Sequence, residues 1–562
     1  MPARPGEPQG GEGSRRVPEV EFRPYGVRVR VPRGSTVLEA ARLASGDLQA
    51  WGLDAPCGGQ GRCGGCTVVV ESGSASGADE REVELLARRG LGQWGASGRR
   101  GLTASRLACR VRVTGDLAVR LPPPSAQARF QTSGAQWTVK PAPAVRLRGP
   151  GPHLGLAVDL GTTKIAAYLV DLEKGDILDT AACLNPQAAH GHDVIARLSH
   201  ALTAPGGRES LRGLAAGAVN GLARELCGLT GHAPESICDA VVVGNTAMHH
   251  LFLGLEIKRL AAAPFRPEVA GPVEVRAGEL GLEIPPAVRV HFLPCIAGYA
   301  GGDHVAVLLA TELDLASRAS MVLDIGTNTE ISLARDGKIT CCSCASGPAF
   351  EGAHISRGMR AETGAVDRVW LEDGEGAVPR YSVIGGAEPV GYCGSALVDL
   401  LAVLLEAGAL DGSGRLRPEA LNGLAVLGAG PQAAVSLGGV PFTQADVRQL
   451  QLAKGAIRSG VEALLAATGT GPGEVARVYL AGAFGVAVDP RKAVRIGMLP
   501  ALPAAEFVTV GNAAGAGACL ALLSAPERKR AEAVARSVTY LELAALPGYQ
   551  ELFLESLGFP DT

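Results

Sequence analysis

Aromatic side chains are scarce in this sequence. Phe, Tyr and Trp make up 4% of the 562 residues, whereas Gly occurs 76 times. Many backbone turns and close helix–strand contacts are expected, because glycine adopts conformations closed to other residues. Hydrophobic residues still account for 47% and charged residues for 19%, which predicts a globular chain and not a disordered one. The length predicts two to four domains.

A strong excess of either charge is also missing. The 53 Lys and Arg residues nearly balance the 56 Asp and Glu residues, so electrostatics gives no reason to expect nucleic acid or an anionic membrane as a partner. No apolar run reaches the roughly 18–20 residues that a membrane-spanning helix needs. The first residues, MPARPGEPQGGEGSRR, lack the apolar segment of a secretory signal. We therefore expect a cytoplasmic protein.

Cysteine is present in an odd number, thirteen, spread along the chain. In a reducing compartment, clustered cysteines bind metal more often than they form disulfides. The densest cluster has the spacing Cys57-x5-Cys63-x2-Cys66, and Cys109 follows after 42 further residues. Five glycines fill this loop, so its backbone can wrap closely around an iron–sulfur cluster. The spacing is one residue longer than the plant-type ferredoxin pattern.

A zinc site and buried structural cysteines are the alternatives for this loop. Zinc sites usually pair two C-x-x-C units, or one such unit with a His pair, and the sequence has no second unit nearby. The stretch APCGGQGRCGGCTVVVESG, followed later by LACRVRVTGDLAVRLP, resembles the adrenodoxin-like 2Fe-2S ferredoxins. The resemblance implies that Cys57, Cys63, Cys66 and Cys109 are the cluster ligands, and that the cluster moves one electron at a time.

The residue pattern divides the chain into segments. We expect a disordered leader over 1–17, an α+β ferredoxin-like domain of the β-grasp type over 18–122, and a Pro/Ala/Gly linker over 123–152. Strands and helices alternate over 153–562, which predicts an α/β region with a helical C-terminal tail at about 526–556.

The ferredoxin-like domain opens with period-two alternation at 19–22 and 27–31, which predicts two strands. Thr36 and Glu39 have the spacing of a capping box. The helix that follows is predicted to present an apolar face, made of Val37, Leu38, Ala41 and Leu43.

Two segments of the α/β region resemble each other: AVDLGTTK at 157–164 and VLDIGTNT at 322–329. A strand–turn–strand hairpin with Gly and Thr offers backbone amides and hydroxyls to a phosphate, and an Asp at a strand end can hold Mg²⁺ through water. A single copy would favour an ordinary hairpin, whereas two copies favour phosphate binding and two duplicated halves, about 153–320 and 321–525. The candidate residues are Asp159, Gly161, Thr162, Thr163, Lys164, Asp324, Gly326, Thr327 and Asn328.

A third segment, VYLAGAFG at 478–485, places small residues after a buried strand. Gly482, Ala483 and Gly485 would let a base and ribose approach the backbone, although a Gly-rich strand–helix turn is the plainer reading. Together the three segments resemble the phosphate-1, phosphate-2 and adenosine motifs of the superfamily that joins actin, sugar kinases and heat-shock chaperone ATPases. This resemblance covers about 154–525 and implies a duplicated, ribonuclease H-like ATPase fold that binds ATP with Mg²⁺, with Asp159 and Asp324 positioning the metal and the attacking water.

A ferredoxin domain fused to this type of ATPase resembles the reductive activators of corrinoid proteins. The similarity extends to the stretches 185–187, 244–250, 297–303 and 345–352. It implies an ATP-dependent iron–sulfur reductase that passes an electron to the Co(II) corrinoid of a methyltransferase partner, restoring Co(I), and that receives electrons from an upstream donor. Whether the protein forms a homodimer stays open. Two other functions also stay open: a redox-responsive binding module controlled by nucleotide, and a small-molecule kinase with an accessory ferredoxin.

Overall fold

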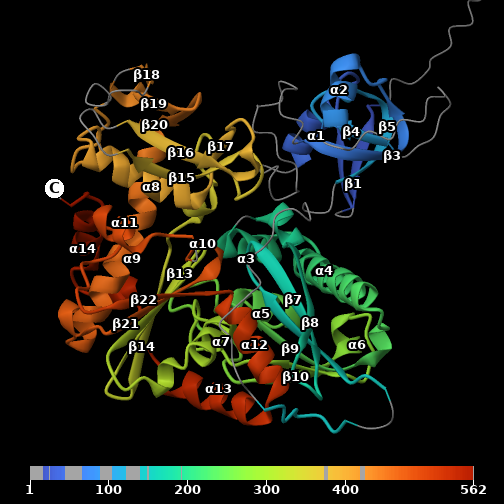
Figure 1. The fold of residues 1–562 in the computed structure, drawn as a ribbon. Coiled ribbons are helices and arrows are strands. Elements are labelled where there is room, and N and C mark those ends of the chain that lie inside the picture. The colour runs from blue at the N-terminus through green and yellow to red at the C-terminus, as the bar shows by residue number, and fades with distance from the viewer. Residues whose placement is uncertain are drawn as a thin grey trace, which may run out of the picture. The chain divides into compact units, whose positions relative to one another are not determined.

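The computed structural model describes residues 17–23, 26–44, 66–88, 104–121, 140–147, 151–191, 193–372, 378–417, 425–428, 430–485 and 487–560. The chain divides into two compact units, Met1–Pro122 and Pro123–Thr562, whose elements are labelled in Figure 1. The leader expected over 1–17 lies outside the described residues except for Val17. No helix in the described part of the chain combines the length and apolarity needed to cross a membrane.

The first unit contains a mixed sheet with the strand order β2-β1-β5-β3-β4 in its described part. Strands β1 and β5 are parallel, and the other neighbours are antiparallel. This arrangement confirms the predicted ferredoxin-like fold. The elements are β1 (Glu19–Arg23), β2 (Val27–Arg30), α1 (Val37–Ala44), β3 (Thr67–Ala75), α2 (Glu80–Arg88), β4 (Ala104–Leu107) and β5 (Val113–Arg120).

Helix α1 begins with the predicted capping box. The Glu39 amide donates to Oγ1 of Thr36, and the Thr36 amide donates to Oε2 of Glu39. Val37, Leu38 and Ala41 are buried as expected, but Leu43 is 69% exposed. The prediction for Leu43 was wrong because each helical residue turns by about 100°, which places Leu43 on the opposite side of α1 from Ala41.

The second unit is built from two sheets of the same design. In the first, β6, β7 and β8 form an antiparallel meander, and β9 and β11 follow in parallel on the other side of β6. In the second, β12, β13 and β14 form the meander, and β21 and β22 follow in parallel beside β12. The repeated order shows the duplication that the two Gly-Thr segments predict.

The first half contains β6 (Leu154–Leu160), β7 (Lys164–Asp171), β8 (Ile177–Leu184), α3 (Val194–Thr203), α4 (Gly207–Thr230), β9 (Ile237–Gly244), α5 (Thr246–Leu253), β10 (Val273–Arg276), α6 (Ala277–Leu280), β11 (Arg289–Phe292) and α7 (Gly302–Ala310). The second half contains β12 (Ser320–Ile325), β13 (Thr329–Arg335), β14 (Lys338–Cys344), α9 (Gln444–Thr468), β21 (Arg477–Ala481), α10 (Gly482–Gly485), α11 (Pro490–Arg495), β22 (Glu506–Gly511) and α12 (Ala513–Leu523).

A helical layer separates the two sheets, with α7 and α12 between them in Figure 1. The two helices pack against each other. A Cβ on Gly517 would lie 2.0 Å from the carbonyl oxygen of Ala306, so this crossing requires glycine. The small residues at 513–518 therefore lie in a closely packed helix. Helices α4 and α9 cover the outer faces of the first and second sheets.

Additional elements lie between β14 and β21. They are β15 (Ala365–Leu371), β16 (Pro379–Val383), β17 (Gly391–Tyr392), α8 (Gly394–Glu406), β18 (Ala425–Leu427), β19 (Ala434–Leu437) and β20 (Val440–Thr443). The tail expected to be helical contains α13 (Ala525–Ser537) and α14 (Tyr549–Ser556), but a short strand β23 (Thr539–Tyr540) interrupts it. That strand pairs with β14, which extends the edge of the second sheet.

Part of the expected linker packs against the second unit. The Ala142 amide donates to the carbonyl of Leu523, and the Ala525 amide donates to the carbonyl of Ala142. Val145 and Leu147 contact the apolar layer between the two sheets. Residues 140–147 therefore belong to the larger unit and not to a free spacer, because their apolar side chains bury surface there. Residues 122–139 and 148–150 lie outside the described residues.

Candidate functional site

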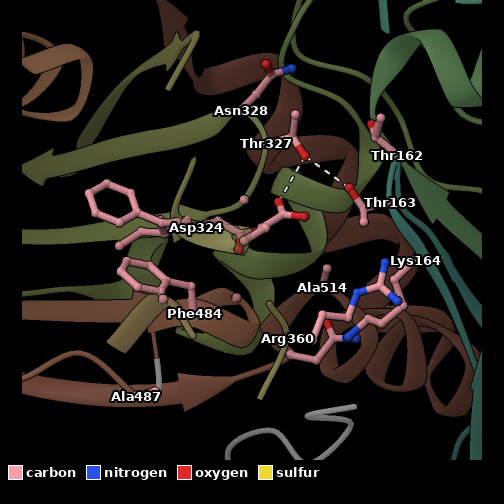
Figure 2. Close-up of a pocket in the computed structure, with 18 of the residues that line it drawn as sticks. Thr162, Thr163, Lys164, Asp324, Thr327, Asn328, Arg360, Phe484, Ala487 and Ala514 are labelled. Carbon is pink, nitrogen blue, oxygen red and sulfur yellow. Dashed lines mark hydrogen bonds between the residues drawn. The ribbon is translucent and has the colours of Figure 1, made fainter. Parts of the chain in front are cut away.

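A cavity of about 460 Å³ in the second unit is lined by both duplicated halves, and Figure 2 shows some of its residues. Most of the predicted nucleotide residues lie on its wall. They are Asp159, Gly161, Thr162, Thr163, Lys164, Asp324, Gly326, Thr327, Asn328 and Gly482. The structure thus brings together the first two segments, which are 165 residues apart in the sequence, and Gly482, which lies 154 residues after Asn328.

The two Gly-Thr turns face each other across this cavity. We call residues 161–163 the first turn and residues 326–328 the second turn. A hydrogen bond of 3.0 Å joins the Oγ1 atoms of Thr163 and Thr327, and Thr327 also donates to Oε1 of Glu351 at 2.9 Å, as the dashed lines in Figure 2 show. Asn245 donates from Nδ2 to Oγ1 of Thr162 at 2.8 Å. The hydroxyls of both turns are therefore held at the cavity wall.

Besides Glu351, four carboxylates gather at the cavity. Asp159 and Asp324 occupy equivalent places in the duplicated halves, each next to the last residue of its strand. Asp303 is the second residue of α7, and Glu330 lies opposite Asp324 in the β12–β13 pair. Asn512, which caps α12, donates from Nδ2 to Oδ2 of Asp159 at 2.9 Å. These side chains come from five different elements.

Burial and mutual repulsion disfavour ionisation of this cluster. Burial, with the charges of Asp159 and Asp324, raises the pKa of Asp303 to about 8. Burial, with the charge of Asp159, raises the pKa of Asp324 to about 7. The pKa of Glu330 also lies well above its usual range because of burial and these neighbours. Burial lowers the pKa of Lys164, while Asp159 opposes that shift.

A divalent cation suits the donor set of this cluster, because hard oxygen ligands are those that Mg²⁺ prefers. Among the described residues, no three His, Cys, Asp or Glu side chains are arranged to hold a metal directly. At nucleotide sites Mg²⁺ usually takes one or two carboxylates and is otherwise held by water and phosphate oxygens.

We expect Mg²⁺ to stabilise the protein more at about pH 8.5 than at about pH 6. The pKa values of Asp303 (about 8) and Asp324 (about 7) lie above the usual 3.8, so the folded state binds more protons than the unfolded state between these limits. Stability must therefore fall as pH rises through this window. Calorimetry should show a midpoint that falls with pH in EDTA and falls less in MgCl₂. Equal Mg²⁺ shifts at both pH values would contradict this prediction.

The third predicted segment contributes Gly482 and Phe484 to the cavity wall. Gly482 has a φ of 86°, and a Cβ there would lie 2.4 Å from the carbonyl oxygen of Ile325 and 3.1 Å from Oδ1 of Asp324. Glycine is thus required where β21 approaches the second turn. Gly485 instead packs against Leu480, and the side chain of Ala483 lies outside the described part of the structure. Nearby, Phe484 stacks on Phe350 with ring centroids 4.8 Å apart.

Several cavity residues were not predicted as site residues. They are Asn245, Asp303, Glu330, Phe350, Glu351, Arg360, Phe484 and Asn512. Of these, the residues that lie in stretches carrying the family resemblance are Asn245, Asp303, Phe350, Glu351 and Phe484. Asp303 follows two glycines at the start of a helix, and Asn512 precedes a small-residue helix as its cap. The sequence contains both of these local patterns, but neither pattern shows that the residue lines a cavity until the fold is known.

Two of the predicted cluster cysteines lie within the described residues. Thr67 pairs with Leu107 between β3 and β4, and the Ala108 amide donates to the carbonyl of Cys66 at 2.7 Å. This pairing brings the segments of Cys66 and Cys109 together despite the 42 residues between them. Cys57 and Cys63 lie outside the described residues.

Three family models match the chain. Residues 20–114 match the 2Fe-2S iron-sulfur cluster binding domain, residues 154–316 the RACo middle region, and residues 318–562 the C-terminal domain of RACo, the ASKHA domain. These matches agree with the two units of the fold. Together they define an iron–sulfur redox enzyme with an actin-like ATPase fold.

Individual relatives identify the family within this class of enzyme. The chain is 34% identical to the corrinoid activation enzyme RamQ of Eubacterium limosum over 73% of this chain and 71% of that protein. It is 26% identical to the Co(II) methylated amine-specific corrinoid protein reductase of Methanosarcina barkeri over 72% and 77% of the two chains. A solved reductive activator for corrinoid, iron–sulfur protein is 28% identical, with a TM-score of 0.68 over 97% and 98%. The chain belongs to this family of corrinoid-activating enzymes.

Proposed function

We propose that this chain is an ATP-dependent reductive activator that passes one electron to the Co(II) corrinoid of a methyltransferase partner and so restores Co(I). The observation that carries the proposal is the combination of the two units in one chain. One unit brings the Cys66 and Cys109 segments together, and the other holds two Thr turns and five carboxylates around one cavity. Family membership supports a corrinoid protein as the partner.

The 2Fe-2S cluster would be held by Cys57, Cys63, Cys66 and Cys109, and it supplies a one-electron carrier when bound. Reduction of a low-potential Co(II) centre is uphill, and each ~59 mV of deficit costs ~1.4 kcal/mol for one electron. Nucleotide binding or hydrolysis offsets this cost if it favours one arrangement of the chain or of the cobalt ligands. An upstream donor re-reduces the cluster after each transfer.

In the cavity, the hydroxyls and amides of the two turns would hold the phosphates of ATP, with Lys164 as a nearby positive charge. Asp159 and Asp324 would hold Mg²⁺, which supplies charge neutralisation at the phosphates when bound. Asp303 lies at the start of α7 on the same cavity wall, and its ionised carboxylate would accept a proton from the attacking water.

The direct test mixes the anaerobically reduced protein, MgATP and a Co(II) corrinoid protein, and follows the optical spectrum of Co(I). Co(I) should accumulate with ATP and not with ADP, and the corrinoid protein should stimulate ATP hydrolysis. A reaction without this chain controls for direct reduction by the chemical reductant. If neither Co(I) nor stimulation appears, the chain is not a reductive activator of that partner, and a nucleotide-controlled binding module becomes the better account.

A further inference from the structure

Arg197 is a fully buried arginine directly behind the first turn. It lies on α3, and its side chain is completely shielded from solvent. Its Nη2 donates to the carbonyl of Thr162 at 2.6 Å, and its Nε donates to the carbonyl of Gly191 at 2.9 Å. Nη1 donates to Oε1 of Gln187 at 3.3 Å. Nη1 also lies 3.3 Å from Sδ of Met248, so all of these hydrogen-bond partners of the guanidinium are neutral.

Asp193 is the carboxylate whose charge acts on the guanidinium of Arg197. Among the described residues, however, no carboxylate lies within ion-pair distance of Arg197. The Asp193 carboxylate accepts from the amide of Ala196 at 2.7 Å, and its charge only partly offsets the effect of burial on the pKa of Arg197. Burial lowers the pKa of Arg197 to about 9, so the side chain is cationic at neutral pH. A buried charge without a partner is costly. Arg528, another buried arginine, instead forms an ion pair with Asp239 at 2.5 Å.

Peptide geometry connects this buried charge to the cavity. In a trans peptide the C=O and the following N–H point in opposite directions. Arg197 holds the Thr162 carbonyl on the protein side, so the Thr163 N–H points to the other side, where Thr163 lines the cavity. Asn185 does the same for the preceding peptide by donating from Nδ2 to the carbonyl of Gly161 at 2.8 Å.

The second turn uses a neutral group for the same purpose. Oγ of Ser346 donates to the carbonyl of Gly326 at 3.2 Å and lies 3.4 Å from that of Thr327. The two turns are thus similarly oriented, but the first has a full positive charge behind it. An anion in the cavity is the partner that this charge lacks inside the protein.

We propose that Arg197 is a positioning residue for the phosphates of the bound nucleotide: it fixes the first turn and supplies positive charge behind it. The inference rests on the proposed nucleotide site and adds a residue outside the cavity wall to it. Because the charge acts on phosphate and not on the base or ribose, the effect of removing it must grow with the number of phosphates on the ligand.

The test compares Arg197→Met and Arg197→Lys with the wild type and with Arg528→Met as a matched buried control. Calorimetry measures the Kd of ATP, ADP and adenosine in MgCl₂. Arg197→Met should weaken ATP binding by roughly 10- to 100-fold, ADP less, and adenosine by no more than about 2-fold. Arg197→Lys keeps the charge and should lose less ATP affinity. Arg528→Met should lower the thermal midpoint without any dependence on phosphate number.

Equal losses for ATP and adenosine in either Arg197 variant would overturn the inference, and so would unchanged ATP binding in Arg197→Met. If Arg197→Met does not fold, the ratio of ATP to adenosine affinity in Arg197→Lys decides the matter. A wild type that binds no ATP would refute the nucleotide site itself. That outcome is distinct from a wild type that binds ATP while the variants show no phosphate dependence.

Discussion

Replacing Asp324 by Asn should lower ATP hydrolysis by roughly 10²- to 10⁴-fold, the size of effect usual for a group that positions reactants or takes part in proton transfer. The same change should raise the thermal midpoint at about pH 8. Asp324 is ionised there, although burial and the charge of Asp159 oppose that charge, so a neutral amide removes the repulsion. A more stable and inactive variant is typical of a site where function is kept at the expense of stability.

Steady-state hydrolysis and calorimetry on the same preparation check both parts. Asp336→Asn is the matched control, because Asp336 lies in the next turn with its side chain 87% exposed and a φ of 51°, which Asn tolerates. This control should keep its activity. If Asp324→Asn retained hydrolysis within about threefold, the predicted role of Asp324 would be wrong. If it lost activity and also stability, Asp324 would be a structural residue.

Replacing Cys109 by Ala should abolish Co(I) formation while leaving ATP binding unchanged. The cluster needs four thiolates, and Ala offers no ligand in the place of one of them. The visible absorption of the cluster and its iron content of two per chain, as a 2Fe-2S centre requires, should be lost together. ATP affinity should stay within about twofold, because the cavity lies in the other unit.

Cys183→Ala provides the control for this second experiment. Cys183 is half-buried like Cys109, but it lies on β8 in the ATPase unit. Its variant should keep iron, absorption and Co(I) formation. A Cys109→Ala protein with full iron and full Co(I) formation would show that a different residue completes the ligand set.

Local sequence patterns predicted the elements of the site well where neighbours in the chain decide the structure. The capping box joins Thr36 and Glu39, which are three residues apart, and both of its hydrogen bonds form in the structure. The two Gly-Thr hairpins likewise form from strand–turn–strand segments, and both lie at one cavity. The Leu43 prediction failed because the assumed apolar face did not follow the helical period.

Long-range packing decided what the patterns missed. Asp303 begins a helix between the two sheets, and Glu330 reaches the cavity only because β13 pairs with β12. Arg197 in the sequence is an ordinary helical arginine, and nothing in its neighbours shows that it will be buried behind residue 162. The sequence of 140–147 predicts a linker. Only the structure shows that α12 and α13 provide an apolar surface on which this segment packs.

The sequence by itself determined the chemistry available to this protein: a cysteine loop typical of an iron–sulfur cluster, and a duplicated turn with Gly, Thr and Asp at fixed spacing. These features depend on the spacing of residues along the chain, so they can be recognised without the fold. Only the tertiary structure decided which carboxylates share a cavity, how far burial raises their pKa values, and which buried cation supports a turn. Those properties depend on distances and on exclusion of water, and both arise only when remote segments pack together.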